Sequence, residues 1–166
     1  MRGMMLAAAA MAFAQLANAE TIDKSGWQVE TTKSEMTGET TNSVARPSSN
    51  KLSNSIGVMT TATLAVYCGS KKPVSVIVIW PDIVDRDYVS NHADVSWKFD
   101  DGPIKSLTVF ASTDAVILNG AAKPFIQQML TAKRVIVKVP DQHGGQEAVF
   151  DLTTIDAVRD DIAACK

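Results

Sequence analysis

The stretch LAVYCGSKKPVSVIVIW, residues 64–80, predicts two neighbouring strands and decides the fold class. A sequence rich in Thr, Ala and Val leads to Cys68, turn residues follow at 69–73, and a β-branched run then ends at Trp80. β-Branched residues favour strands, and turn residues between two such runs are typical of a hairpin. We therefore expect residues 58–67 and 74–80 to pair as antiparallel strands.

The first nineteen residues have the pattern of a secretory signal peptide. A positive residue at position 2 precedes an apolar run from Met4 to about Phe13, and the small residues Ala17 and Ala19 form a cleavage pattern. The run is shorter than the roughly 20 apolar residues of a spanning helix, which argues against an uncleaved anchor. We expect export to the periplasm and cleavage after Ala19; Glu20, which is not a cysteine, argues against lipid attachment there.

Composition after cleavage indicates a single domain. Removing residues 1–19 leaves 147 of the 166 residues and changes the net charge from −2 to −3, because Arg2 is lost. That length is enough for one core, and the charge predicts no basic face for nucleic acid. The longest later apolar run, residues 76–80, is too short to cross a bilayer, so we expect no stable membrane insertion.

The two cysteines, Cys68 and Cys165, are predicted to form a disulfide. An exported chain with an even number of cysteines favours a disulfide over free thiols or a metal pair. Near the end of the chain, Ile155, Val158 and Ile162 have helical spacing that continues to Cys165, so this cysteine is expected to point inward. Closing a loop of this length is worth about 4–5 kcal/mol in the loop-entropy model. A redox-active pair is the alternative, but the Cys-x-x-Cys spacing is missing.

The remaining patterns predict an antiparallel, β-rich α+β domain, sandwich or barrel-like, with about seven strands. Residues 20–55 are expected to form an edge strand near WQVETTK (27–33) and then a polar, flexible segment, and residues 56–166 the β-rich core. Asp101 and Gly102 predict a tight hairpin with Ile104 facing inward; Leu107 and Val109 have the opposite parity, which requires a bulge or a strand covered on both faces. Further expectations are a short helix within residues 119–132, with Pro124 in its first turn, strands at 134–139 and 146–152, and a last helix starting near Thr153.

No nucleophile, metal or phosphate-binding motif is present, so we predict no catalytic residues, no metal and no cofactor. His92 and His143 are expected in exposed polar segments. Asp82, Asp85 and Asp87 are expected in a solvated loop, with a calcium site as the alternative. The three tryptophans, Trp27, Trp80 and Trp97, are expected in the core, with a stacking surface for sugar or peptide as the alternative.

The order of several features resembles the VasI/TagO-like family of type VI secretion-associated exported proteins. A signal peptide is followed by Trp27, a strand ending in Cys68, VSWKFDDGP (95–103), STD (112–114), a short helix, AVFDL (148–152) and a final helix closing with Cys165. This chain has Lys98 where members often have an arginine, and it lacks the tryptophan that members often have shortly before the Ser112 equivalent. The resemblance implies a bacterial periplasmic accessory protein, with a role in secretion as a weaker extension.

These observations lead us to expect a non-enzymatic binding protein whose partner is an envelope or secretion-system protein. The candidate binding residues are Lys98, Asp100, Asp101, Ser112 and Asp114. One alternative is an exported inhibitor of a lytic glycosidase such as lysozyme. Another is an envelope hydrolase, which would require Asp100, Asp101, Ser112 or Asp114 to converge in one pocket.

Overall fold

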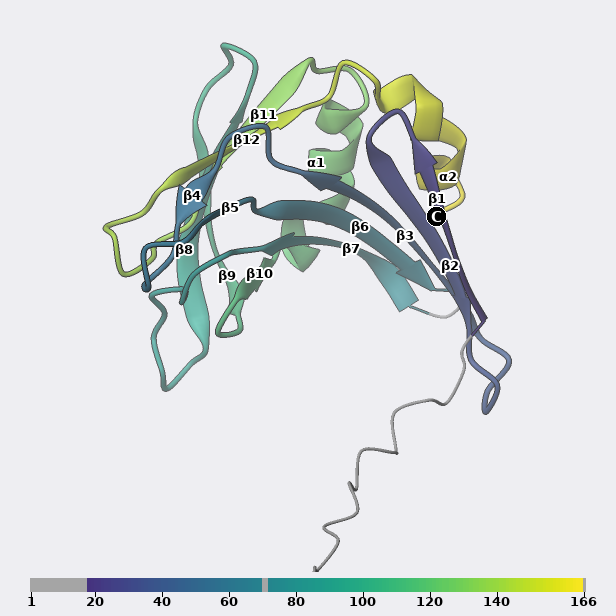
Figure 1. Cartoon of the computed structure of the whole chain (residues 1–166), viewed down its shortest axis with the longest axis horizontal. Coiled ribbons are helices and arrows are strands. Elements are labelled where there is room, and N and C mark those ends of the chain that lie inside the picture. The colour runs from purple at the N-terminus through teal and green to yellow at the C-terminus, as the bar shows by residue number, and fades with distance from the viewer. Residues whose placement is uncertain (1–17, 70–71, 166) are drawn as a thin grey trace, which may run out of the picture.

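The computed structural model describes residues 18–69 and 72–165. Within these ranges the chain forms a ten-stranded antiparallel sheet, a separate two-stranded hairpin and two short α-helices, each preceded by a 3-10 helix (Figure 1). The predicted signal peptide, residues 1–19, lies outside the described residues except for Asn18 and Ala19. In chain order the elements are β1 (Asn18–Lys24), β2 (Trp27–Lys33), β3 (Thr40–Pro47), β4 (Leu52–Ser53), β5 (Met59–Thr60), β6 (Thr63–Gly69), β7 (Lys72–Ile79), β8 (His92–Phe99), β9 (Lys105–Ala111), β10 (Ala115–Ile117), η1 (Asn119–Ala121), α1 (Ala122–Met129), β11 (Arg134–Lys138), β12 (Glu147–Asp151), η2 (Ile155–Val158) and α2 (Arg159–Ala163).

The large sheet has the strand order β1-β2-β3-β6-β7-β10-β9-β8-β11-β12. Figure 1 shows a curved sheet: β3, β6 and β7 cross the centre, while β1 and β2 stand at one side and β8 and β9 at the other. The expected antiparallel, β-rich α+β class is confirmed. The expected count of about seven strands is too low, since ten strands form one continuous sheet where a sandwich would have two. The barrel-like closure is also not seen, because the end strands, β1 and β12, do not pair within the described ranges.

The missing strands come mainly from the polar N-terminal part. WQVETTK is the second strand and not an edge strand, since it pairs with β1 on one side and with β3 on the other. The segment expected to be a flexible loop contains β3, which pairs with both β2 and β6. Only Ser43 and Val44 of β3 are buried, and the other β3 residues give no apolar alternation. Its strand structure is therefore held largely by main-chain pairing that the side-chain pattern does not reveal.

One hydrophobic core lies on the inner face of the sheet. It includes Val66 and Val76 from the predicted central hairpin, which pair directly, and Phe125 and Met129 from α1. Ile155, Val158 and Ile162 are buried as expected, although the final helix is split into η2 and α2. The predicted disulfide between Cys68 and Cys165 is confirmed. It fastens the end of the chain to β6, and Figure 1 shows α2 beside β1 and β2.

The β8–β9 connection differs from the expected tight hairpin. β9 begins only at Lys105, which pairs with Trp97, so residues 100–104 form a longer turn. Asp100 has a φ of 47°, the left-handed region that Asn and Asp tolerate best among residues with a side chain. Ile104 lies in this turn and is 71% exposed, so the expectation that it faces inward is wrong. Val109 then falls on the buried face without the bulge that its parity required.

The outer edge of β12 is covered by the segment that follows β3. The side-chain amide of Asn50 donates to the carbonyl of Glu147 and accepts from the N–H of Val149, at 2.8 Å each, as a strand backbone would. Gln146 makes the same kind of paired contact with the main chain of Ser53. Edge strands tend to be covered in this way because an open edge invites association.

Candidate functional site

The three tryptophans are all nearly buried, as expected, but they differ in one respect. The indole N–H of Trp27 donates to the hydroxyl of Thr154 at 3.2 Å, and that of Trp80 donates to the carboxylate of Asp141 at 3.0 Å. Within the part of the chain that the structure describes, the indole N–H of Trp97 has no hydrogen-bond partner, and its nitrogen is not among the buried unsatisfied atoms. Buried tryptophans usually bond this group, so Trp97 marks a place where a donor remains available.

Trp97 lines a groove that results from unequal strand lengths. β9 has seven residues, but β10 has three and pairs only with Phe110 and Ala111 of β9. After β10 the chain leaves the sheet and forms η1 and α1, so no described strand continues beside residues 105–109. The resulting groove has a volume of about 430 Å³. It is lined by Trp97, Lys105, Ser106, Leu107, Gly120, Ala121, Pro124, Phe125 and Gln128.

The floor of the groove is aromatic and its rim carries one cation. The ring centroids of Trp97 and Phe125 are 5.9 Å apart, and those of Phe99 and Phe125 are 5.0 Å apart in an edge-to-face arrangement. Leu107, 38% exposed, presents apolar surface beside them. Lys105 is half-buried and forms no ion pair with any described residue. The groove thus combines an apolar floor with one positive charge that has no ion-pair partner among the described residues.

The candidate residues Asp100 and Asp101 lie together, beside a shallow depression of about 640 Å³ at the start of β11. The carboxylate of Asp100 accepts hydrogen bonds from the main-chain N–H groups of Lys133 and Arg134. Both nitrogens lie 3.1 Å from the same oxygen, Oδ1. Asp101 forms an ion pair with Arg134 at 3.1 Å. Lys98 lies on β8 opposite Ile136 and does not line the depression. Asp100 therefore has a structural role, since it fixes the chain between α1 and β11.

Asp151, on the same depression, is also satisfied within the chain. The carboxylate of Asp151 accepts two hydrogen bonds from Thr153, one from the main-chain N–H at 2.9 Å and one from the side-chain hydroxyl at 2.7 Å. These two hydrogen bonds, together with the positive charge of Arg46, hold the pKa of Asp151 below its ordinary value despite partial desolvation. Because the three carboxylates that line the depression, Asp100, Asp101 and Asp151, are already engaged within the chain, the depression is a poorer binding site than the groove.

Ser112 and Asp114 are not brought to the other candidates. They lie in the turn after β9, at the opposite end of that strand from Asp100 and Asp101. Seven strand residues span about 20 Å, so the four side chains do not share one pocket. The hydroxyl of Ser112 donates to the carboxylate of Asp114 at 3.2 Å in an exposed turn. The convergence that the hydrolase alternative requires is absent from this structure.

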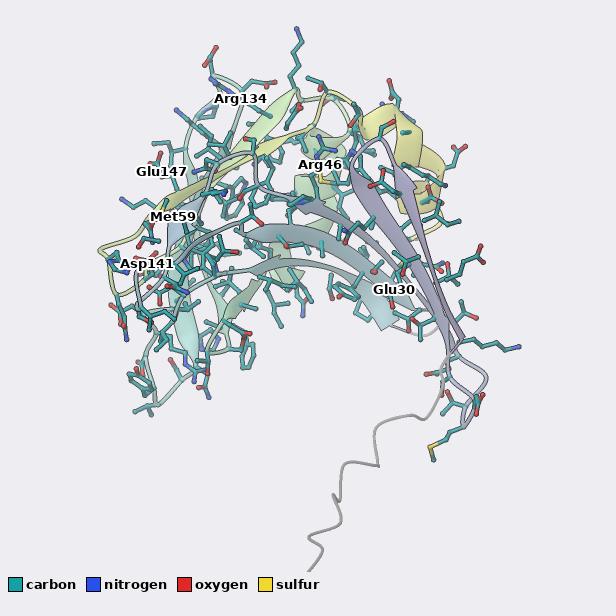
Figure 2. The ribbon with its side chains drawn as sticks, in the orientation of Figure 1. Glu30, Arg46, Met59, Arg134, Asp141 and Glu147 are labelled. Atoms are coloured by element: carbon teal, nitrogen blue, oxygen red, sulfur yellow. A yellow bond between two sulfur atoms is a disulfide. The ribbon has the colours of Figure 1, made fainter. Side chains whose placement is uncertain are left out.

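A buried carboxylate that the sequence did not reveal, Asp141, organises the β11–β12 loop. It accepts from the indole of Trp80, from the N–H groups of His143 and Gly145 at 2.9 and 3.0 Å, and from the amide of Gln146 at 3.1 Å. Burial raises the pKa of this carboxyl, but the hydrogen bonds from Trp80, Gly145 and Gln146 together outweigh it, and the net pKa is lowered. Figure 2 shows Asp141 and Arg134 well apart, at the two ends of β11.

The expectation that Asp82 lies in a solvated loop is wrong. Asp82 is 5% exposed and accepts the N–H of Ser55 at 2.9 Å, whereas Asp85 and Asp87 are exposed as expected. Its second oxygen has no hydrogen bond but lies 3.3 Å from Nε2 of His143, which is itself 40% exposed. His92 is exposed as expected and is the first residue of β8. Among the described residues, no group of three or more His, Cys, Asp and Glu side chains is arranged to hold a metal.

Comparison with known proteins shows a likeness in fold. No family model and no curated protein matches the sequence. The fold is similar to the crystal structure of invasion associated protein B from Bartonella henselae, with a TM-score of 0.56 and 11% identity, over 87% of this chain and 96% of that chain. The chain is thus a disulfide-linked, antiparallel β-rich domain with that fold. No described helix has the length and apolar character that a membrane span requires.

Proposed function

We propose that this protein is an exported, non-enzymatic accessory protein of the bacterial envelope that binds a protein partner in the groove between β9 and α1. The observation that carries the proposal is the groove itself, in which the aromatic rings of Trp97 and Phe125 lie beside Lys105, a cation with no ion pair to any described residue. The residues that line this groove include no carboxylate and no histidine, the groups that most often act as general acid or base. This composition supports binding over hydrolysis.

Export is supported by the signal-peptide pattern and by the disulfide. Disulfides persist in oxidising compartments such as the periplasm. Cleavage after Ala19 would remove Asn18 and Ala19, which pair with Lys33 and Thr32 at one end of β1, and would leave the pairs from Glu20 to Lys24 intact. Mass spectrometry of the exported protein tests this, because the proposal predicts a mature chain that begins at Glu20 with both cysteines oxidised.

An envelope role also draws support from two likenesses. The sequence motifs resemble a family of exported proteins associated with type VI secretion, and the structural neighbour is named an invasion associated protein. A link to a secretion system remains a proposal that rests on the motifs alone. The lysozyme-inhibitor alternative is separated by assay, since it requires the purified protein to inhibit a lysozyme.

The experiment is affinity capture from the periplasm of the producing bacterium, with the mature protein as bait. Leu107→Asp places a charge in the apolar groove, and Ile104→Asp places the same charge on an exposed residue outside it. The proposal predicts that the wild type and Ile104→Asp capture the same partner. Leu107→Asp should bind this partner at least about 10-fold more weakly, a loss of about 1.4 kcal/mol in binding free energy. Equal capture by all three baits would exclude the groove as the binding site.

A further inference from the structure

The main chain of β9 has an open edge along the groove. The N–H of Ser112 points to the β10 side of the strand and donates to the carbonyl of Ala115. The N–H of Ala111 points to the β8 side and donates to the carbonyl of Asn91. Because successive N–H groups of a strand point to opposite sides, those of Ser106 and Thr108 point away from β8. No described strand pairs with these two residues on that side. Each therefore offers one N–H and one C=O to a new strand.

The edge is accessible from the groove. Ser106 and Leu107 are both exposed, and their side chains point to opposite faces of β9. A groove lined by both residues must therefore run along the strand edge, where the main chain is presented. β10 already occupies the same side of β9 at Phe110, which shows that a strand fits there in line.

The side chains around the edge complement one kind of strand. Alternate side chains of an added strand would face the aromatic floor formed by Trp97 and Phe125, and the intervening ones would face solvent. Lys105 is the first residue of β9 and has no ion-pair partner among the described residues, so it could bind a carboxylate of the added strand. The charge and apolar patterns thus match an extended segment with alternate apolar residues and an acidic end.

We propose that the groove takes an extended peptide segment of the partner, which adds as a strand to β9 and places a carboxylate at Lys105. This inference rests on the proposed function, because it specifies how the same groove recognises its partner. Main-chain hydrogen bonds to Ser106 and Thr108 supply the pairing, and the Trp97–Phe125 floor and Lys105 select the sequence. A β9 edge that instead paired with a second copy of this chain would make the protein a dimer.

The test measures the affinity of two fluorescein-labelled seven-residue peptides of alternating valine and threonine. One peptide carries a glutamate at its N-terminal end, and the other carries it at its C-terminal end. Backbone N-methylation is applied to one alternate set of peptide residues or to the other. Only one set can face β9, so we expect methylation of that set to weaken binding at least about 10-fold and methylation of the other set to change it less than about twofold. Replacing the glutamate by lysine in the peptide, or Lys105→Ala in the protein, is expected to weaken binding of the better peptide.

Two protein variants test the same contact from the other side. Ser106→Pro removes the N–H that points into the groove and no bond to β8, while Ser106→Ala keeps this N–H. We expect the first to lose binding and the second to bind like the wild type. The methylated peptides keep the test independent of any folding defect in Ser106→Pro.

Absence of saturable binding up to about 1 mM, about −4 kcal/mol of affinity, would overturn strand addition, and so would equal effects of the two methylated sets. A wild-type dimer in sedimentation, dissociated by Ser106→Pro, would overturn it in favour of a second copy. If peptides fail but Leu107→Asp still abolishes capture of the partner, strand addition falls and the proposed function stands. If Leu107→Asp leaves capture intact, the proposed function itself falls.

Discussion

Cys68 and Cys165 are separated by 97 positions in the sequence, yet their Cα atoms lie 5.1 Å apart. Cys68 belongs to β6, in the middle of the sheet, and Cys165 follows α2 at the end of the chain. The disulfide therefore closes most of the domain into one covalent loop. It also holds α2 close to β3, on the same side as Lys24, whose ammonium forms an ion pair with Asp161 at 2.7 Å.

Cys165→Ala is expected to lower the free energy of unfolding by about 2–5 kcal/mol, because the unfolded chain regains the freedom that the long loop removes. Chemical denaturation of the mature protein measures this loss. The double variant Cys68→Ala/Cys165→Ala should lower the free energy of unfolding little more than the single variant does, since either substitution breaks the same disulfide. Equal stability of oxidised and reduced wild type would contradict a structural role for the disulfide.

Asp141→Asn is expected to remove part of the acid sensitivity of the protein. The pKa of Asp141 is lowered in the folded state, so its carboxylate stabilises the fold above the unfolded value of about 3.9 and loses that effect as the pH falls through the folded value. At pH 7 the free energy of unfolding of the variant should be about 1–3 kcal/mol lower than that of the wild type, because the asparagine mismatches its hydrogen-bond partners. This difference in unfolding free energy should shrink below about pH 4. A difference that grew below about pH 4 would contradict a lowered pKa for Asp141.

Substitutions at Asp100 test whether this residue stabilises the fold or binds the partner. Asp100→Ala removes the acceptor for the N–H groups of Lys133 and Arg134 and places alanine at a φ of 47°. We expect a loss of about 1–3 kcal/mol in unfolding free energy and no change in partner capture. Asp100→Asn keeps an acceptor and tolerates this φ, so thermal unfolding should find it closer to the wild type. Loss of capture in a folded Asp100→Asn would restore the residue as a binding candidate.

Gly26 and Gly38 form a matched pair for the contact between the β1–β2 turn and Arg46. Both glycines have positive φ, 82° and 69°, but a Cβ at Gly26 would collide with the guanidinium of Arg46, while a Cβ at Gly38 would meet nothing within 4 Å. Arg46 donates to the carbonyl of Ser25 at 2.7 Å and lies 5.5 Å from the ring centre of Trp27.

Gly38→Ala should therefore cost about 1 kcal/mol from backbone strain alone, and Gly26→Ala clearly more. Thermal or chemical unfolding of the two variants gives the comparison. Equal losses would show that Arg46 moves aside freely and does not fix this turn.

The sequence predicts those elements whose side chains repeat with a clear period. The apolar run around Val76 and the helical spacing of Ile155, Val158 and Ile162 report burial directly, and they locate the central hairpin and the inward-facing Cys165. β3 was missed because only Ser43 and Val44 on it are buried, so its partners β2 and β6 determine its structure.

The candidate site was harder to predict than the fold. The groove joins Leu107 on β9 to Phe125 on α1, and it exists because β10 is shorter than β9, which no local pattern encodes. The one signal was the unexpected parity of Leu107 and Val109. Asp100 and Asp101 are already engaged by a hydrogen bond and an ion pair within the chain, and Ser112 and Asp114 lie at the other end of β9.

The most direct measurement is site-specific photo-crosslinking in the periplasm, with a photoreactive residue introduced at position 107 or, as the control, at position 104. Leu107 lines the groove and Ile104 lies in the exposed turn just before β9. The account predicts one discrete crosslinked partner at position 107, lost when Ser106→Pro is added, and little at position 104. Crosslinking at position 104 alone, or none at position 107 in the folded protein, would contradict it.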